Sequence, residues 1–217
     1  PHSVRHKSAE DSAYFSNKRI EQAKQLRQVY DWHLPLVVSP YDSELDCHWW
    51  AEGVQFLDFF FRDIHQQNEV RAVTPGDFLD SGIPIQMQQP TASSWGENGY
   101  YKVWLNEGNS WMYPYSHDAE RKMTELANRF EYPSEMERRV LNQLARELLL
   151  AQSSDWAFQI YQGTTVQYSS RRFQSHIHRF DLLATMLETN DFNEPLLKEI
   201  EWRDNIFAEI DYRVYRS

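Results

Sequence analysis

The sequence predicts an α/β segment followed by an all-helical bundle. Between residues 16 and 80, stretches with helical periodicity alternate with short, continuously apolar stretches. That alternation is typical of an α/β barrel or of a doubly wound sheet. From residue 110 onward the apolar residues recur at helical spacing alone, which predicts a bundle of four or five helices.

The N-terminal elements follow one another closely. A helix is expected over residues 16–30 with Ser16 as its cap, and residues 34–39 form an apolar, β-branched run typical of a strand in a parallel sheet. A helical pattern over 54–64, a second short strand over 70–73 and a short helix after Thr74 come next. A closed barrel needs about eight such units, so this part is too short to close one.

The second half begins with an irregular stretch over residues 81–109, which carries Trp95 and Trp104 among Gly, Pro, Ser, Gln and Asn residues. Long loops of this kind are usually functional. Beyond it, Ser134 and Glu137 have the spacing of a capping box, and Gly163 is expected to end a short helix. The aromatic tail over 207–215 is expected to pack back on the bundle.

Composition narrows the possible partners. A formal net charge of −10 argues against binding to the negatively charged backbone of nucleic acid. The sequence has no apolar run of about 18 residues, which argues against a membrane partner. A single Cys excludes an internal disulfide and favours a cytoplasmic location. His176 and His178 are two apart on a helix and cannot share a face, so we expect no metal, and no cofactor is indicated.

An aromatic content of 15% has two interpretations, large-residue core packing or a surface on which sugar rings stack. Trp111, Trp156 and Trp202 lie on helical patterns and are expected in the core. Trp95 and Trp104 lie in the irregular loop, where they either hold the loop in place or form a sugar platform.

The candidate catalytic loop is residues 41–50, which follow the first predicted strand and hold three carboxylates, one His and two Trp. Parallel α/β barrels build their sites at such strand ends. An apolar aromatic wall raises the pKa of a nearby carboxyl group, and a general acid needs that shift. Asp42 is therefore the candidate acid, although a turn or cap role is also open to it. His48 could likewise be a hydrogen-bonded structural residue instead of a ligand-binding one.

Five segments resemble one known family when they are taken in order. The run Val-Val-Ser-Pro-Tyr-Asp-Ser-Glu-Leu-Asp-Cys-His-Trp-Trp-Ala-Glu-Gly at 37–53 resembles the motif of glycoside hydrolase family 57 that carries its catalytic Asp. The similarity is greatest to the 1,4-alpha-glucan branching enzyme group. Residues 93–96, 106–111, 148–156 and 210–215 resemble the C-terminal part of that group.

The resemblance implies a fold and a division of the chain. Residues 1–90 would be the C-terminal portion of an incomplete seven-stranded (β/α) barrel carrying the acid/base loop. Residues 91–109 would be an aromatic cleft loop, and residues 110–217 a C-terminal helical domain.

The resemblance also implies an activity, which is retaining cleavage of an α-1,4-glucan and transfer to a 6-hydroxyl group. Asp42 corresponds to the acid/base of that reaction. Trp95, Trp104, Trp50 and His48 correspond to residues that contact an amylose- or glycogen-like glucan.

Two departures qualify that implication. The family usually has Phe-Gly where this chain has Asp46-Cys47, and its nucleophile Glu belongs to barrel strands that precede this chain. The isolated chain is therefore expected to be inactive and to need the N-terminal part of the same protein as its partner. A 4-alpha-glucanotransferase or amylase of the same family, or a non-catalytic α-glucan-binding protein, are the alternatives.

Overall fold

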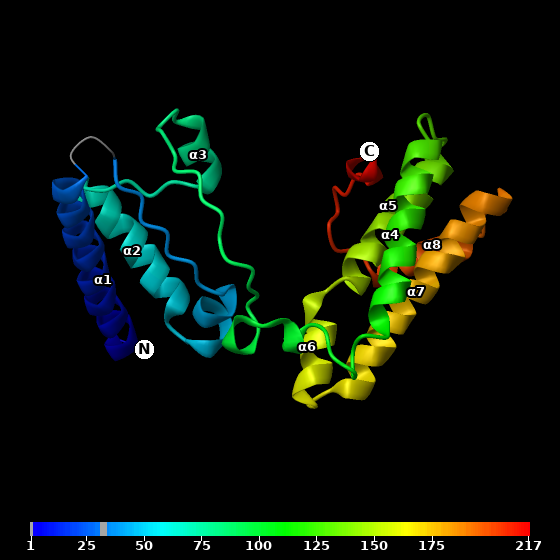
Figure 1. Cartoon of the computed structure of the whole chain (residues 1–217), viewed down its shortest axis with the longest axis horizontal. Helices are drawn as coiled ribbons and strands as arrows, with labels where there is room; N and C mark the ends of the chain where they lie inside the picture. The colour runs from blue at the N-terminus through cyan, green and yellow to red at the C-terminus, as the bar shows by residue number, and fades with distance from the viewer. Residues whose placement is uncertain (1, 31–33) are drawn as a thin grey trace. The chain divides into compact units, whose positions relative to one another are not determined.

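The computed structural model describes residues 2–30 and 34–217, and within them the chain divides into two compact units. The first covers residues 1–89 and the second residues 90–217. All regular elements in the described residues are helical (Figure 1).

The first unit is built on two packed helices, α1 (His2–Val29) and α2 (Gly53–Gln67). Three serines spaced four apart, Ser8, Ser12 and Ser16, are fully buried on one face of α1. Small residues let two helix backbones approach closely, and the Ser12 hydroxyl donates to an Asp63 carboxylate oxygen of α2 at 3.3 Å. Ser16 therefore does not cap a helix over 16–30 as expected, because the helix begins fourteen residues earlier and Ser16 lies inside it.

The two predicted strands do not form in the described residues. Residues 34–42 and 70–74 have no regular structure. A strand is stable only when a neighbouring strand satisfies its backbone hydrogen bonds. Neither segment has such a neighbour in residues 34–217, and Val38 is 74% exposed where burial on both faces was expected. The α/β part of the predicted fold class is therefore not seen in residues 2–30 and 34–217.

The short helix after Thr74 is confirmed as α3 (Pro75–Asp80). The Thr74 hydroxyl accepts the Asp77 amide at 3.1 Å, and the Asp77 carboxylate accepts the Thr74 amide at 3.2 Å. This reciprocal pair satisfies two amides that the first helical turn leaves without partners.

The second unit is the predicted helical bundle. It consists of α4 (Met112–Arg129), α5 (Glu135–Ala151), α6 (Ser154–Gln162), α7 (Val166–Thr189) and α8 (Glu194–Arg203). Helix α5 packs on α7, and α4 contacts both (Figure 1). The largest fully buried apolar side chains on these helices are Met123, Leu126, Leu141, Leu144, Leu148, Phe173, Phe180, Leu183 and Leu197.

The helix boundaries of this unit follow from local sequence chemistry. The capping box of Ser134 and Glu137 is present, with the carboxylate accepting the Ser134 amide at 2.6 Å. Gly163 ends α6 with φ 72°, a left-handed conformation that glycine adopts without a steric penalty. Both predictions are confirmed.

The aromatic tail packs back on the bundle, as expected. Tyr212, in the 3-10 turn η4 (Tyr212–Tyr215), is 1% exposed, and its hydroxyl donates to the Phe130 carbonyl at 2.7 Å. Arg216 donates to the same carbonyl at 2.8 Å. The tail thereby satisfies a carbonyl group at the end of α4 that has no partner within its helix.

The prediction that Trp156 lies in the core is confirmed, since its side chain is 8% exposed. The same prediction is wrong for Trp202, which is 80% exposed. Leu197 and Ile200 of α8 are buried, and Trp202 follows Ile200 by two positions. Two helical positions turn a side chain by about 200°, so Trp202 faces away from the core. No described helix combines the length and apolarity needed to cross a membrane.

Candidate functional site

Asp42 lies where an irregular segment turns into the loop that leads to α2. The amide of Leu45 donates to the Asp42 carbonyl at 3.0 Å, and a π-helical turn, η1 (Leu45–Trp49), follows. Turns of this kind are rare and occur often at functional sites. Asp42 itself is exposed, so the apolar wall expected around it is not supplied by the described part of the first unit.

Gly53 fixes how this loop meets α2. A Cβ at position 53 would lie 2.6 Å from the Asp46 Cα atom, so no larger residue fits without moving the loop. The resemblance motif ends at this glycine, and its close approach to Asp46 gives a physical reason for Gly at that position.

His48 and Trp50 lie in the same loop with different environments. His48 is exposed, and its ring lies 5.6 Å from the ring of Trp49, which is 75% exposed. Trp50 is half-buried, with its ring 4.9 Å from that of Phe56 in α2. Asp42 and His48 are thus presented outward, whereas Trp50 has a packing role in this unit.

Trp95 and Trp104 belong to the second unit, in a tightly folded loop with two 3-10 turns, η2 (Glu97–Gly99) and η3 (Tyr101–Val103). The Ser94 hydroxyl donates to the Tyr100 carbonyl at 2.7 Å and accepts the Gly96 amide at 3.0 Å. A Cβ at Gly96 would lie 2.2 Å from the Tyr100 carbonyl oxygen, so only glycine allows the loop to close there.

The C-terminal end of this loop is held by two buried groups. Asn109 is fully buried, and its amide donates to the Val103 carbonyl at 3.0 Å and to the Ala157 carbonyl of α6 at 3.3 Å. The Tyr113 hydroxyl donates to the Trp104 carbonyl, and burial raises the pKa of Tyr113. Trp104 therefore has a fixed backbone.

Trp95 and Trp104 line one pocket of about 450 Å³ together with residues of α6. Trp95 is 83% exposed, and the Trp104 ring lies 6.1 Å from that of Phe158. The complete lining is Trp95, Glu97, Val103, Trp104, Phe158, Tyr161 and Gln162. Aromatic faces with a few polar groups suit a sugar ring, which has apolar faces and a rim of hydroxyl groups.

The α6 side of this pocket was not found from the sequence. Phe158 lies in the short helix that Gly163 ends, between the buried residues Trp156 and Ile160, yet it is 39% exposed. Phe158 and Tyr161 are three residues apart and share a helix face. That spacing was the available signal, but it does not distinguish a pocket wall from a core stripe.

The candidate residues therefore fall into two groups. Asp42, His48 and Trp50 share a loop of the first unit, and Trp95 and Trp104 share a pocket of the second.

A separate buried cluster in the bundle brings three possible metal ligands together among the described residues: Glu147, His176 and Asp204. The His176 Nδ1 atom lies 2.7 Å from a Glu147 oxygen, and Arg179 lies 2.8 Å from an Asp204 oxygen and 3.7 Å from Glu147. The guanidinium already supplies positive charge to both carboxylates, so an ion network accounts for the cluster without a cation.

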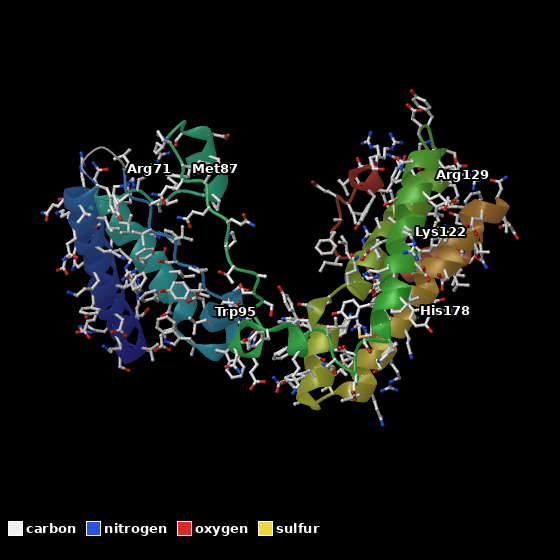
Figure 2. The ribbon with its side chains drawn as sticks, viewed as in Figure 1. Arg71, Met87, Trp95, Lys122, Arg129 and His178 are labelled. Atoms are coloured by element: carbon white, nitrogen blue, oxygen red, sulfur yellow. The ribbon has the colours of Figure 1, made fainter. Side chains whose placement is uncertain are left out.

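The His176 ring is fully buried between Glu147 and Arg172. Its Nε2 atom lies 3.1 Å from the Arg172 guanidinium, which can only donate. An Nε2 atom that accepts from Arg172 leaves Nδ1 free to donate to the Glu147 carboxylate. His178 is exposed on the same helix (Figure 2), as the spacing of the two residues predicted.

Comparison with known proteins shows what the chain, and above all its second unit, is similar to. Residues 115–215 match the family described as 1,4-alpha-glucan branching enzyme, C-terminal. The chain is 38% identical over 188 residues to a 1,4-alpha-glucan branching enzyme of Thermococcus kodakarensis, covering 84% of this chain and 28% of that enzyme. It is 27% identical over 186 residues to a probable 1,4-alpha-glucan branching enzyme of Mycobacterium tuberculosis, covering 82% of this chain and 35% of that protein.

Solved structures agree with this similarity. The GH57 branching enzyme of Thermococcus kodakaraensis, in complex with glucose and additives, matches with a TM-score of 0.76 and 31% identity, over 100% of this chain and 40% of that one. The GH57-type branching enzyme of Pyrococcus horikoshii matches with a TM-score of 0.72 and 32% identity, over 99% of this chain and 41% of that one. The alpha-amylase AmyC of Thermotoga maritima matches with a TM-score of 0.68 and 36% identity, over 99% of this chain and 39% of that one.

The resemblance to GH57 branching enzymes is thereby confirmed. The chain spans between 28% and 41% of the length of these relatives.

Proposed function

We propose that this chain, whose residues 115–215 match the C-terminal domain of 1,4-alpha-glucan branching enzymes, is the C-terminal part of a retaining branching enzyme. The observation that carries the proposal is the pocket of Trp95 and Trp104, which offers aromatic faces of the kind on which α-glucan rings stack. The enzyme would cleave an α-1,4-glucan and transfer the cleaved chain to a 6-hydroxyl group.

Asp42 is the proposed acid/base. A retaining glycosidase needs one carboxyl group that first protonates the leaving oxygen and then deprotonates the acceptor. Asp42 is exposed three residues before a π-helical turn, within the segment that resembles the family's catalytic motif. Its apolar surroundings would come from barrel residues that precede this chain.

Trp95 and Trp104 are the proposed main substrate contacts, and His48 and Trp50 the secondary ones. Trp95 has most of its surface free to stack on a sugar, whereas Trp104 is held in place by its backbone. His48 is exposed and can donate to a hydroxyl group. Trp50 contacts Phe56, so it would contribute at most one edge of its ring.

The N-terminal part of the same protein is the proposed partner that completes the site. The nucleophile carboxylate must lie roughly 5–5.5 Å from the acid/base in a retaining enzyme. The apolar residues 34–38 and 70–73 would pair with barrel strands of that part, since they have strand-like composition and no neighbour in the described residues. Residues 1–90 would then be the end of the (β/α) barrel, with 91–109 as the cleft loop and 110–217 as the helical domain.

Hydrolysis is the second candidate activity. The match to the Thermotoga maritima alpha-amylase, at 36% identity, favours an amylase almost as much as the other structures favour a branching enzyme. The two activities differ only in whether the acceptor is a sugar hydroxyl or water.

The binding of maltoheptaose to the 217-residue chain, measured by isothermal titration calorimetry, tests this proposal. Substituting Trp95→Ala removes a stacking face, and we expect affinity to fall about 5-fold, since stacking on an aromatic ring contributes on the order of 1 kcal/mol.

Trp202→Ala is the matched control, because Trp202 is 80% exposed, close to the 83% of Trp95, but lies outside the pocket. We expect the Trp202→Ala variant to bind maltoheptaose with the same affinity as the unchanged chain. Equal losses in both variants, or no binding of maltoheptaose at all, would refute a glucan site at Trp95.

A further inference from the structure

The N-terminal half of the pocket loop is tied to α6 by one side-chain pair. The Tyr161 hydroxyl donates to a Glu97 carboxylate oxygen at 2.9 Å, and both residues line the pocket. Among the described residues, the other hydrogen bonds of residues 93–100 stay within the loop, between Ser94, Gly96, Glu97, Gly99 and Tyr100.

The two ends of the loop are therefore held very differently. Residues 103–113 are anchored by buried groups, through Asn109 and Tyr113. Residues 95–99 are anchored at the surface, where Trp95 and Glu97 are exposed. Asn98 and Gly99 both have positive φ, 57° and 78°, so the loop reverses direction just after Glu97.

We propose that Tyr161 is a positioning residue, which through its hydrogen bond to Glu97 holds Trp95 at the distance from α6 that a glucose ring of an α-glucan requires. The inference rests on the proposed function, because it concerns the same pocket. Glu97 is two residues from Trp95, so fixing the Glu97 carboxylate limits the movement of the intervening backbone. Tyr161 acts through Glu97 and needs no contact with the sugar.

The charge of the acceptor supports this role. A hydroxyl group donating to a carboxylate forms a stronger bond than one donating to a neutral oxygen. The same bond raises the pKa of Tyr161, together with burial and the negative charge of Glu97. The hydroxyl therefore stays protonated, and the bond persists, throughout the neutral range.

Four substitutions separate positioning from stability. Tyr161→Phe removes only the hydroxyl group and Glu97→Ala removes only the acceptor, whereas Glu97→Gln keeps an oxygen that can accept. Tyr132→Phe is the control, because Tyr132 is 90% exposed and lies outside the pocket. Since the Tyr161–Glu97 bond is at the surface, the midpoint of thermal unfolding should be unchanged in all four.

The first measurement is the affinity of the 217-residue chain for maltoheptaose. We expect Tyr161→Phe and Glu97→Ala each to weaken binding about 3- to 10-fold, and the double variant to weaken it no further, because one bond is lost in every case. Glu97→Gln should keep most of the affinity. Equal affinity for Tyr161→Phe and Tyr132→Phe would overturn the inference.

The second measurement does not depend on glucan binding. Amide hydrogen exchange of residues 94–104 should be faster in Tyr161→Phe than in Tyr132→Phe, because the loop opens more often. Unchanged exchange would overturn the inference even if affinity fell. Failure of the unchanged chain to bind maltoheptaose would count against the proposed function, while the exchange result would still decide whether Tyr161 positions the loop.

Discussion

Glu147 is fully buried in the helical bundle, where His176 and Arg179 surround its carboxylate. Arg179 also reaches Asp204 at the end of α8, and Arg146 donates to the carbonyls of Ile206 and Phe207. These bonds join α5 and α7 to the chain that leads into the aromatic tail. Burial makes each of them costly to lose, because an unpaired group inside the protein cannot return to water.

Glu147→Ala should lower the free energy of unfolding by about 3–5 kcal/mol, since removing one partner of a buried ion pair leaves the other charges uncompensated. Urea unfolding monitored by far-UV circular dichroism gives this value. Glu125→Ala is the control: Glu125 is 63% exposed and lies 3.9 Å from Lys122, so its loss should cost about 0–1 kcal/mol. Similar effects of the two substitutions would show that the buried network does not stabilise the bundle.

Single elements of the bundle follow closely from local sequence. Helix α5 begins at a serine whose hydroxyl accepts the Glu137 amide at 3.3 Å, while the Glu137 carboxylate returns to the Ser134 amide. The sequence spacing alone predicted this start, because the two side chains satisfy amides that no other group can reach.

Ser134→Ala should lower the free energy of unfolding by about 0.5–2 kcal/mol, the usual cost of losing an N-cap. Ser134→Asp should restore most of it, because Asp also accepts from the first turn and its charge suits the helix N-terminus. Urea unfolding compares the three proteins. A Ser134→Asp variant as unstable as Ser134→Ala would mean that the serine contributes through packing and not through capping.

The elements that could not be predicted depend on contacts distant in sequence. Residues 34–39 have strand composition, but a strand exists only beside another strand, and the described residues offer none. Trp202 follows a helical apolar pattern, yet which face of α8 is buried depends on where α5 lies. Phe158 and Tyr161 were missed for the same reason, since their role depends on a loop about 55 residues earlier.

In the candidate site, the sequence located the two tryptophans of the pocket and the loop of Asp42. It could place them because Trp and Gly residues in an irregular stretch, and carboxylates after an apolar run, are local signals. The bond between Tyr161 and Glu97 leaves no local signal, because it joins residues 64 positions apart.

At the scale of the whole molecule, the first unit exposes several large apolar side chains. Leu34, Leu36 and Val38 are 57%, 45% and 74% exposed, and Met87 is 94% exposed. Exposed apolar segments with unpaired backbone groups promote association. We therefore expect the 217-residue chain to self-associate.

Light scattering should give a mass above 26.0 kDa that rises with concentration. Substituting Leu36→Lys and Val38→Lys together should lower the mass, because charges on an unpaired segment oppose pairing. The control variant Tyr132→Lys, at a 90% exposed position of the second unit, should leave the mass unchanged. A mass of 26.0 kDa at every concentration would contradict the expectation.

The central claim is that Asp42 is the acid/base of a branching enzyme whose other carboxylate lies outside this chain. The most direct measurement is the rate at which α-1,6 linkages form in amylose, counted by proton NMR, for this chain joined to the proposed N-terminal part. We predict that Asp42→Asn lowers this rate by about 10²- to 10⁴-fold, as expected for loss of a general acid/base, while maltoheptaose affinity is retained. Undiminished linkage formation by Asp42→Asn, or linkage formation by the 217-residue chain alone, would contradict the account.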